Sequence, residues 1–580
     1  MPLPPLANLI AICEPDPASA EALAGQMSKT EAGFDEVWRP HDRWVVGVKG
    51  LPASEPDGPE ARGLGLAFAE GRQLFGQNDA MLMELSELAR ENPKQLARFP
   101  GDFGFLQIDS NGEAFVARSC AGLAPFYHWA GGDRAAVSTR VEWLARWALA
   151  DPQPDGLVGA LWSTGWAWFP DDRSPLAGVL VLPRGSFVSF LPGGVFERGT
   201  YWNPRPGSLP EFRDSDAAER AVEFRRLLID RLEQDLDPDG GNLLALSGGV
   251  DSGSLGALAG GVLKREVWTA SMLPEPEDAY RLEMSFIDPL KKLFGFEKEW
   301  QFRVTPELQL EMAEEAPRVP FPVVNPTLCL LPRILAEARV RVLFGGEFAD
   351  RLVGCVSTIP DFMAAGGIGG VLRHFGFSSL GRQLALSWAK RKVTGRVPND
   401  VPFPDDLPPL FDQTLREEVR EFHDRVQREA ACDFGPWKQL TLFLKQDGWL
   451  AMNWETVSAL NIRRSFPYFH RAAVELTYAC HPAELVGPNT KKILRRALAG
   501  DVPARNLNRS DKGSWGGYLL RKDSSPQPWG SPFPEFLNGV VRRDWLATPP
   551  KEIDFADLKR LTRLIVFGEN TGNAAWEPSS

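Results

Sequence analysis

The stretch LSGGVDSGS, residues 246–254, follows the apolar run NLLA and precedes a segment rich in small residues. An apolar run that ends in glycines and continues into such a segment predicts a strand, a tight turn and a helix. The two glycines let the backbone turn tightly and bring its N–H groups toward a polyanion. Ser247 and Ser252 add hydroxyl donors, and the helix adds its positive end. Because the Gly-Lys-Ser/Thr ending of a Walker loop is missing, we interpret the stretch as a phosphate-binding turn of a different kind.

Asp251 stands in the middle of this turn. Its negative charge repels phosphate, so it makes sense there as a ligand for Mg²⁺ that bridges phosphates. A plain structural turn would explain the glycine pair. It would not explain the strand, Ser, Asp, Ser and helix together.

Strands and helices alternate after this turn. Strands are expected in VWTASM (267–272), EKEWQFRV (297–304) and RVRVLFGG (339–346), with helices at 279–294 and 327–339 between them. This alternation predicts a parallel, doubly wound α/β sheet, whose ligands bind outside the carboxyl ends of the strands. The turn at 247–252 and a second glycine-bearing loop at 345–350 both lie at such ends. From 414 onward the pattern is helical.

The first 200 residues have a different pattern. Short apolar or alternating runs bounded by Gly, Asp, Asn and Pro predict an α+β region rich in antiparallel strands, at 43–50, 103–110, 113–119, 178–183 and 185–191. The Pro- and Gly-rich passage 203–212 is typical of a linker. We therefore expect one domain at 1–205 and a second at 212–580. A Pro-rich segment at 398–409 is either a solvated connector or a mobile flap over a large substrate.

Composition excludes several classes of protein. The chain has 580 residues, 43% of them apolar and 24% charged, so it can bury large cores and is not disordered. No stretch of the sequence is apolar enough to span a membrane, and the start lacks the basic region of a secretory signal. Six cysteines without a CxxC pair exclude a disulfide scaffold and the usual zinc ribbons, and the net charge of −12 argues against non-specific nucleic-acid binding. We expect a cytoplasmic protein that contacts neither membrane nor nucleic acid.

Five motifs in order resemble those of the asparagine synthetase B family. SGGVDS at 247–252 is similar to the pyrophosphate loop of ATP pyrophosphatases, and FGGEFADRLVG at 344–354 is similar to the family's TGEGADELFG, with Phe348 in place of a glycine and Arg351 in place of a glutamate. RRSFPYFHRAAVEL, KKILRRAL and PARNLNRSDKGSW follow in the family's order. In the first half, GDFGFLQIDSNGEAFVARSCAGLAPFYHW and GTYWNP also match its pattern. The resemblance covers nearly the whole chain. It implies an Ntn-hydrolase-like glutaminase domain followed by an ATP-pyrophosphatase synthetase domain.

The resemblance implies roles for particular residues. Asp251 and Asp350 match the two aspartates that hold Mg²⁺ on the phosphates, although a helix N-cap would also explain Asp350. Lys512 matches a catalytic lysine that stabilises either the oxyanion or the departing phosphates, and nine Lys/Arg against four Asp/Glu in 484–523 fit a triphosphate. Glu347 is either a general base or a partner of the metal or lysine. The expected ATP-binding residues are Leu246, Ser247, Gly248, Gly249, Asp251, Ser252, Ser271, Met272, Gly345 and Gly346, and Glu283 packs near the nucleotide. The histidines His128, His374, His423 and His481 lack ligand spacing, and we interpret them as structural.

The N-terminal half departs from the glutamine-dependent members of the family. Those members carry a cysteine directly after the initiator Met, and its thiol attacks glutamine while its own α-amine serves as the base. Here Pro2 stands at that position, and Cys13 is internal and more typical of a buried apolar residue. We therefore expect a glutaminase-like domain without its chemistry, so that the amine arrives with the substrate.

Relatives without that cysteine are similar to lasso-peptide macrolactam synthetases and β-lactam synthetases. The length of the chain and the Pro-rich segment favour a peptide substrate. The first hypothesis is a carbon–nitrogen ligase that uses ATP and Mg²⁺, forms AMP and pyrophosphate, adenylates an Asp or Glu side chain of a leader-cleaved core peptide and closes a lasso macrolactam. Its partners would be a leader peptidase and a leader-recognition protein. A β-lactam-forming or ammonia-dependent ligase acting on a small molecule is the second hypothesis, and a pseudoenzyme scaffold is the third. His470 stands where the lasso enzymes usually have Asp, so that role is not carried over.

Overall fold

A computed structural model of the chain describes most of the regions that bear the motifs. The described residues are 8–29, 33–49, 63–69, 72–74, 92–99, 102–121, 124–164, 169–190, 196–205, 216–296, 298–305, 326–354, 406–429, 435–445, 447–485, 491–509 and 540–542, together with a few single positions. The Pro-rich segment 398–409 therefore lies mostly outside the described residues, as do Lys512 and His374.

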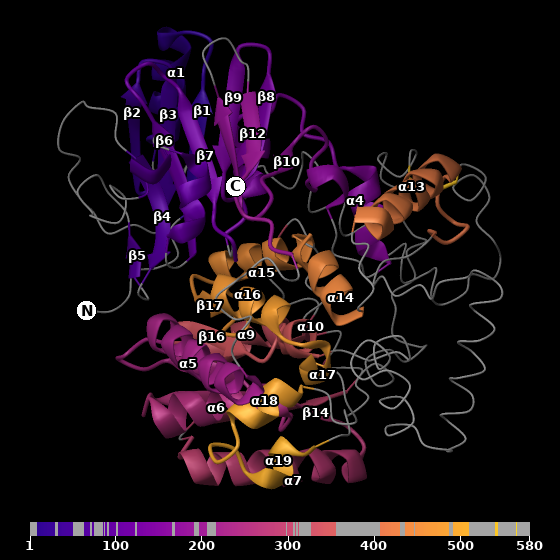
Figure 1. The fold of residues 1–580 in the computed structure, drawn as a ribbon. Helices are drawn as coiled ribbons and strands as arrows, with labels where there is room; N and C mark the ends of the chain where they lie inside the picture. Colours follow the sequence, from indigo (N-terminus) through magenta and orange to yellow (C-terminus); the bar gives the residue numbers. More distant parts are fainter. Residues whose placement is uncertain are drawn as a thin grey trace.

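Two antiparallel sheets of six strands each form the first part of the described chain (Figure 1). The first sheet has the order β10-β8-β9-β1-β3-β2 and the second has the order β12-β11-β7-β6-β4-β5. Their strands are β1 (Asn8–Cys13), β2 (Glu36–His41), β3 (Trp44–Lys49), β4 (Gly63–Ala69), β5 (Arg72–Leu74), β6 (Asp102–Ile108), β7 (Ala114–Arg118), β8 (Tyr127–Gly131), β9 (Arg134–Ser138), β10 (Leu180–Val181), β11 (Ser186–Phe190) and β12 (Phe196–Thr200). The five strands expected here from the sequence are confirmed as β3, β6, β7, β10 and β11.

Alternation along β1 shows how these layers are built. Leu9 and Ala11 pack between the two sheets, against residues of β6, β7 and β11. Ile10 and Ile12 point to the other face, where the helices α1 (Pro17–Met27), α3 (Val141–Trp147) and α4 (Gly156–Ser163) cover the sheet. The side chains of β1 alternate between two buried faces, so the sequence of the strand is continuously apolar and does not alternate between apolar and polar residues. Two short 3₁₀ turns, η2 (Pro93–Arg98) and η3 (Pro170–Asp172), complete this part.

A five-stranded parallel sheet in the order β15-β14-β13-β16-β17 forms the second part. Its strands are β13 (Asn242–Ala245), β14 (Val267–Pro274), β15 (Glu299–Val304), β16 (Val342–Gly345) and β17 (Arg463–Ser465). Leu244 and Phe344 face a core shared with α5 (Ala217–Asp235), α6 (Val250–Gly256) and α7 (Glu277–Phe294), whereas Leu243 and Leu343 face α9 (Pro326–Glu337) and α15 (Gly448–Ala459). With helices on both faces, the expected parallel, doubly wound arrangement is confirmed.

The fifth strand corrects the expectation of a purely helical pattern from 414 up to the Pro-rich passage near 526–534. β17 has three residues, Arg463–Ser465, and pairs in parallel with β16 from Val342↔Arg463 to Phe344↔Ser465. Asn461, in the left-handed region at φ 54°, ends the preceding helix and turns the chain into the strand. So short and charged a strand has no apolar periodicity of its own. Its position is set by the sheet edge that it joins.

The remaining helices belong to the second part, although α13 (Gln413–Glu429) packs against α4 and not around the glycine loops (Figure 1). They are α10 (Ala349–Val353), α13 (Gln413–Glu429), α14 (Gly435–Leu444), α16 (Arg471–Ala479), α17 (Pro482–Leu485), α18 (Lys492–Ala497) and α19 (Ala504–Leu507), with a π-helical turn, η5 (Ala257–Val262), continuing α6. α5 starts at a capping box in which Asp216 and Glu219 satisfy each other's backbone N–H groups. Within the described ranges, no helix combines the length and apolar character needed to cross a membrane.

Buried charges join the strands of the first part to the helices of the second. Arg118 on β7 and Arg184 before β11 both pair with Asp447, at 3.2 and 3.1 Å. Trp202 donates its indole N–H to Glu475 at 2.9 Å. These pairs accompany an apolar core that includes residues of both parts. The boundary expected between 205 and 212 stays a prediction, because 206–215 lie outside the described residues.

Candidate active site

The first glycine loop folds as the sequence indicates, directly after β13. Gly248 has φ 64°, which favours glycine, and a Cβ there would lie 2.9 Å from Phe286 Cβ. Ser247 N–H donates to Ser252 Oγ at 3.1 Å, and the two hydroxyl oxygens are also 3.1 Å apart. Asn506 on α19 donates to the Gly248 carbonyl at 3.3 Å. Hydrogen bonds between its own serines therefore close the turn, and Asn506 stabilises it from α19.

The second glycine loop lies against the first. A Cβ at Gly346 would lie 2.7 Å from Asp251 Cβ and 2.8 Å from the backbone nitrogen of Ser252, so only glycine fits at this contact. A Cβ at Gly345 would meet the carboxylate of Glu347 at 2.3 Å. The structure thus brings together the two loops that the sequence places 98 residues apart, at the carboxyl ends of neighbouring strands β13 and β16.

The two aspartates expected to hold a metal share one partner, Lys491. Its ammonium is ion-paired with Asp251 and lies 2.7 Å from Asp350 Oδ1. The lysine side chain is only 3% exposed, and its backbone sits in the left-handed region at φ 65°, before α18. A Cβ at Gly354 would approach the Lys491 backbone nitrogen to 3.0 Å, so the last glycine of the second motif lets Lys491 reach the loop.

The residues present fit a divalent cation. The Lys491 ammonium shows that Asp251 and Asp350 already converge on one positive charge. Among the described residues, no group of three or more His, Cys, Asp or Glu could hold a metal by itself. Two carboxylates leave an octahedral Mg²⁺ with open positions, which is usual where substrate phosphates and water complete the shell. Asp350 is the second residue of α10 and Phe348 is its N-cap, so the capping explanation of Asp350 does not hold.

Two more cations approach the first loop. Arg509 forms a bidentate pair with Glu283 on α7, with Nη1 to Oε2 at 2.9 Å, and its guanidinium lies over Phe286, 4.2 Å from the ring centroid. Arg495 on α18 donates to the Arg509 carbonyl at 2.9 Å. Burial lowers the pKa of Arg495, and the charge of Asp251 partly opposes that shift. Glu283, expected to pack near the nucleotide, therefore orients an arginine at the loop.

Glu347 is held by a buried arginine. Its carboxylate is ion-paired through Oε1 with Arg464 of β17, whose side chain is 3% exposed. Burial lowers the pKa of Arg464, and Glu347 opposes that shift. The second oxygen, Oε2, is buried without a hydrogen-bond partner among the described residues. One oxygen of Glu347 is thus fixed and the other is available, and the choice between general base and partner of a cation stays a prediction.

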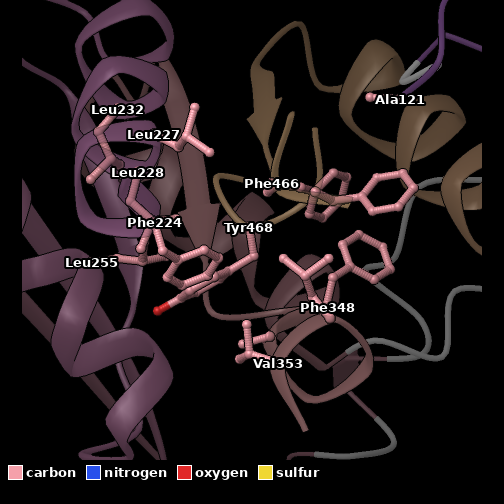
Figure 2. Packing of buried hydrophobic residues seen from close by; sticks show 14 of the residues in the cluster. Ala121, Phe224, Leu227, Leu228, Leu232, Leu255, Phe348, Val353, Phe466 and Tyr468 are labelled. Atoms are coloured by element: carbon pink, nitrogen blue, oxygen red, sulfur yellow. The ribbon is translucent and has the colours of Figure 1, made fainter. Parts of the chain in front are cut away.

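Phe348 follows Glu347 in a conformation that is rare for a bulky residue. Its φ is 73°, in the left-handed region that the glycine of the family pattern would tolerate. Its ring contacts four others, with centroid distances of 4.7 Å to Phe443, 4.9 Å to Trp449, 4.9 Å to Phe466 and 5.0 Å to Phe469. Figure 2 shows Phe348 and Phe466 turned toward one another in the core. We call these five residues the aromatic cluster.

Tyr468 lies between the aromatic cluster and the first loop. Its hydroxyl donates to the Asp251 carbonyl at 2.9 Å, and burial raises its pKa well above the usual value. Its ring stacks with Phe224 on α5 at 6.5 Å (Figure 2). The FPYF passage 466–469 therefore contacts both loops.

The other expected ligands lie near these loops or outside the described residues. Leu246 is buried and donates its N–H to the Ala270 carbonyl at 2.9 Å. Ser271 and Met272 follow Ala270 on β14, the strand next to β13, and so lie at the same edge of the sheet. Gly249 is the N-cap of α6. The position of Lys512 is not described, so its role stays a prediction.

Sequence reasoning missed several residues that the structure brings to the loops. Lys491, Arg464, Arg509 and Tyr468 all lie inside motifs quoted for the family resemblance, yet none of them was assigned a role. The available signal for Lys491 was a lysine at the start of the basic run KKILRR. Burial of a lysine cannot be read from its neighbours in sequence, because the carboxylates that neutralise it lie 240 and 141 residues away.

This geometry defines a site for a polyanion and its cation at the carboxyl edge of a parallel sheet, the usual position for ligands in such folds. The family model described as asparagine synthase matches residues 223–516, a range that contains both loops, Lys491 and Lys512. The chain belongs to the asparagine synthase family. It is accordingly an ATP-dependent, amide-forming ligase, and enzymes of this family typically use Mg²⁺ with ATP.

Two solved structures are among those similar to this chain, both at low identity. One is the glutamine phosphoribosylpyrophosphate amidotransferase from B. subtilis complexed with ADP and GMP, with 10% identity, 52% of this chain and 92% of that chain covered, and a TM-score of 0.23. The other is described as the allosteric regulatory enzyme of purine biosynthesis, with 9% identity, 51% and 90% covered, and a TM-score of 0.23. None of the curated proteins matches the chain.

Proposed function

We propose that this protein is a macrolactam synthetase that adenylates an Asp or Glu side chain of a core peptide and closes a lasso ring with the peptide's own α-amine. The observation that carries the ligase site is the convergence of Asp251, Asp350 and Lys491 beside the glycine turn. The choice of a peptide substrate rests on the sequence resemblance to lasso-peptide synthetases.

The reaction would proceed in two steps. A substrate carboxylate oxygen attacks the α-phosphorus of ATP, the bond to the β-phosphate oxygen breaks, and pyrophosphate leaves. The amine nitrogen then attacks the acyl carbon, and the tetrahedral oxyanion collapses with loss of AMP. Mg²⁺ bound by Asp251 and Asp350 would neutralise charge on the phosphates.

The chain's own groups have distinct tasks in this scheme. The glycine turn and the hydroxyls of Ser247 and Ser252 would hold the phosphates, and Lys491 would turn from the carboxylates toward the leaving pyrophosphate. Glu347 Oε2 is the free oxygen that could accept the proton lost by the attacking ammonium. Lys512 would stabilise the oxyanion. In this proposal residues 212–580 are the ATP-pyrophosphatase unit.

The proposal also treats residues 1–205 as a glutaminase-like Ntn unit without thiol chemistry. Four cysteines lie in the described ranges, and three of them, Cys13, Cys329 and Cys480, have a pKa raised by burial. A thiol with a raised pKa is a poor nucleophile. This supports a reaction in which the amine is supplied by the substrate.

The test uses purified protein with ATP, Mg²⁺ and a panel of peptides that each carry a free α-amine and one internal Asp or Glu. A cyclase releases AMP and pyrophosphate and yields a product lighter by one water. The N-acetylated panel should give pyrophosphate release and a hydroxylamine-trapped acyl group, but no ring. ADP in place of AMP would refute the ligase chemistry. Turnover of small acids with ammonia, and of no peptide, would favour a small-molecule ligase and refute the macrolactam.

A further inference from the structure

Arg184 of the first part reaches the aromatic cluster that surrounds Phe348. The Arg184 guanidinium lies 5.0 Å from the Phe469 ring centroid and 5.8 Å from that of Phe443. Its Nη2 donates to the Phe443 carbonyl at 3.0 Å and also to Leu444, at the end of α14. Its Nε lies 3.1 Å from Asp447 Oδ1. Charge, stacking and hydrogen bonds therefore fix one edge of the cluster from the turn before β11, outside the ligase sheet.

The same cluster encloses the residue whose backbone aims the second loop. Phe348 stands between Glu347 and Asp350, and its left-handed φ of 73° sets the direction in which α10 starts. In this region a side chain with a Cβ is less stable than glycine. Phe348 stays there because its ring is enclosed by Phe443 and Phe469, the two rings under Arg184. If the enclosure loosened, the backbone would relax and Asp350 would move away from Lys491.

We infer that Arg184 is a positioning residue of the ligase site: through the aromatic cluster it holds Phe348 in its left-handed conformation, so that Asp350 stays aimed at the cation. The first part of the chain would thereby contribute to ATP binding although the proposed function assigns it no chemistry of its own. This inference rests on the proposed function only through the cation that Asp350 binds.

The alternative is that the aromatic cluster only packs the core and does not hold the backbone of Phe348. A comparison of Phe348→Gly with Phe348→Ala distinguishes the two. If only packing matters, Phe348→Gly is as harmful as Phe348→Ala or more so, because both lose the ring and glycine adds chain entropy. If the left-handed conformation matters, Phe348→Ala is worse, because alanine lacks the ring and still disfavours this φ. The penalty for a left-handed residue corresponds to about fivefold to thirtyfold in the population of the competent loop.

The first measurement needs no turnover. The probe is the α,β-methylene analogue of ATP, titrated with Mg²⁺ and followed by calorimetry on the full chain. Because apparent affinity falls with the competent fraction, the Mg²⁺ concentration for half-maximal binding should be about fivefold or more higher in Phe348→Ala than in Phe348→Gly. In the nucleotide-free protein, amide hydrogen exchange across 349–353 should follow the order wild type, Phe348→Gly, Phe348→Ala, from slowest to fastest. Equal or reversed behaviour of the two variants would overturn the inference.

The second measurement isolates Arg184. Arg184→Lys keeps the charge next to Asp447 but removes the planar group that stacks on two rings. It should raise the Mg²⁺ requirement and speed exchange across 349–353. The matched control is Arg140→Lys, which alters a buried pair with Glu455 of α15, 2.9 Å away, without touching the rings. Equal effects of the two lysine variants would refute a specific role for Arg184.

The inference can still be tested if Arg184→Lys does not fold. If Arg184→Lys does not fold, Phe443→Leu removes one ring beneath the guanidinium and keeps an apolar side chain, and it should produce the same shift in Mg²⁺ requirement. Unchanged Mg²⁺ dependence in that variant would contradict the inference. If the wild type does not bind the analogue at all, the proposed function fails, whereas the exchange order of the Phe348 variants still decides the inference.

Discussion

Replacement of Lys491 by methionine tests most directly how the site holds a cation. The ammonium is ion-paired with Asp251 and lies 2.7 Å from Asp350, and its side chain is 3% exposed. Methionine is unbranched and carries no charge. The two carboxylates that converge on one point would then lose the ammonium between them, while Arg495 stays near Asp251.

The size of the effect follows from the exposure of each partner. At an effective dielectric constant near 20, a charge pair 4 Å apart gains about 4 kcal/mol before any desolvation cost. The Asp350 side chain is 46% exposed, so solvent screening limits the stability gained from its ion pair with Lys491 to about 1 kcal/mol or less. Asp251 is 20% exposed and faces a buried ammonium, so loss of its partner costs about 3 kcal/mol. We expect the free energy of unfolding to fall by about 3–4 kcal/mol without Mg²⁺.

The same change should strengthen Mg²⁺ binding in the absence of nucleotide. In the wild type a divalent cation has to displace the ammonium, whereas in Lys491→Met no ammonium competes with it for the two carboxylates. Because 1.4 kcal/mol corresponds to a factor of ten, a gain of about 3 kcal/mol would raise the Mg²⁺ affinity by at most about 100-fold, and we expect a rise of at least about tenfold. Pyrophosphate release should nonetheless fall by about 10²–10³-fold, because a cation that faces the leaving group is lost.

The assay is thermal unfolding at increasing Mg²⁺, with pyrophosphate release measured in parallel. The control is Lys492→Met, the next lysine along α18, whose pKa is lowered by burial and by Arg496. The melting temperature of Lys491→Met should start lower and rise at lower Mg²⁺ concentration than that of the wild type or the control. Superimposable Mg²⁺ titrations for all three proteins would refute the idea that Lys491 and the metal share Asp251 and Asp350.

Four further outcomes are expected. Asp251→Asn and Asp350→Asn should each abolish ATP-dependent pyrophosphate release with an unchanged circular dichroism spectrum, and near-normal release would remove that residue from the metal site. Glutamine should yield no glutamate above a boiled control, in keeping with Pro2 after the initiator Met and with the raised pKa of the half-buried Cys13 thiol. Burial lowers the pKa of His128 to about 4, so its contribution to stability should be complete above pH 6.5 and be lost as the pH falls toward 4. In His128→Phe the number of protons taken up on unfolding, read from the slope of stability against pH, should fall by about one in this range. An unchanged slope would contradict the assignment. Lys512→Ala should still exchange pyrophosphate into ATP but lose ring closure by about 10²–10³-fold, and equal losses in both steps would place the lysine on the phosphates.

The parallel sheet was predictable because its three central strands are buried on both faces. β13, β14 and β16 read as short apolar runs, and each is followed by glycines, a helix or both. The edge strand β17 has the opposite character. Its arginines reach Glu347 and the acidic end of α5, where burial lowers the pKa of Arg463 and Asp235 opposes the shift. A strand that forms because of its pairing with β16 and its ion pairs cannot be predicted from local periodicity.

The glycine loops were predictable for a related reason. Gly248 and Gly346 are required by backbone geometry, one by its positive φ and the other by contact with Asp251 and Ser252. Such requirements leave a mark in the sequence, because no other residue fits. Lys491 and Phe348 leave no such mark. Their conformations are sustained by side chains from other elements, so the sequence showed only a lysine in a basic run and a departure from a family pattern.

The charges of the described site also bear on what lies outside it. Asp251, Asp350, Glu283 and Glu347 are matched by Lys491, Arg509 and Arg464, with Arg495 beside Asp251. Before any ligand binds, four carboxylates are therefore balanced by four cations. A magnesium-bound triphosphate still carries net negative charge, so its binding would require further positive charge nearby. The basic excess of 484–523 continues past Arg509 through Lys512, Arg521 and Lys522, so the sequence offers candidates for that charge outside the described residues.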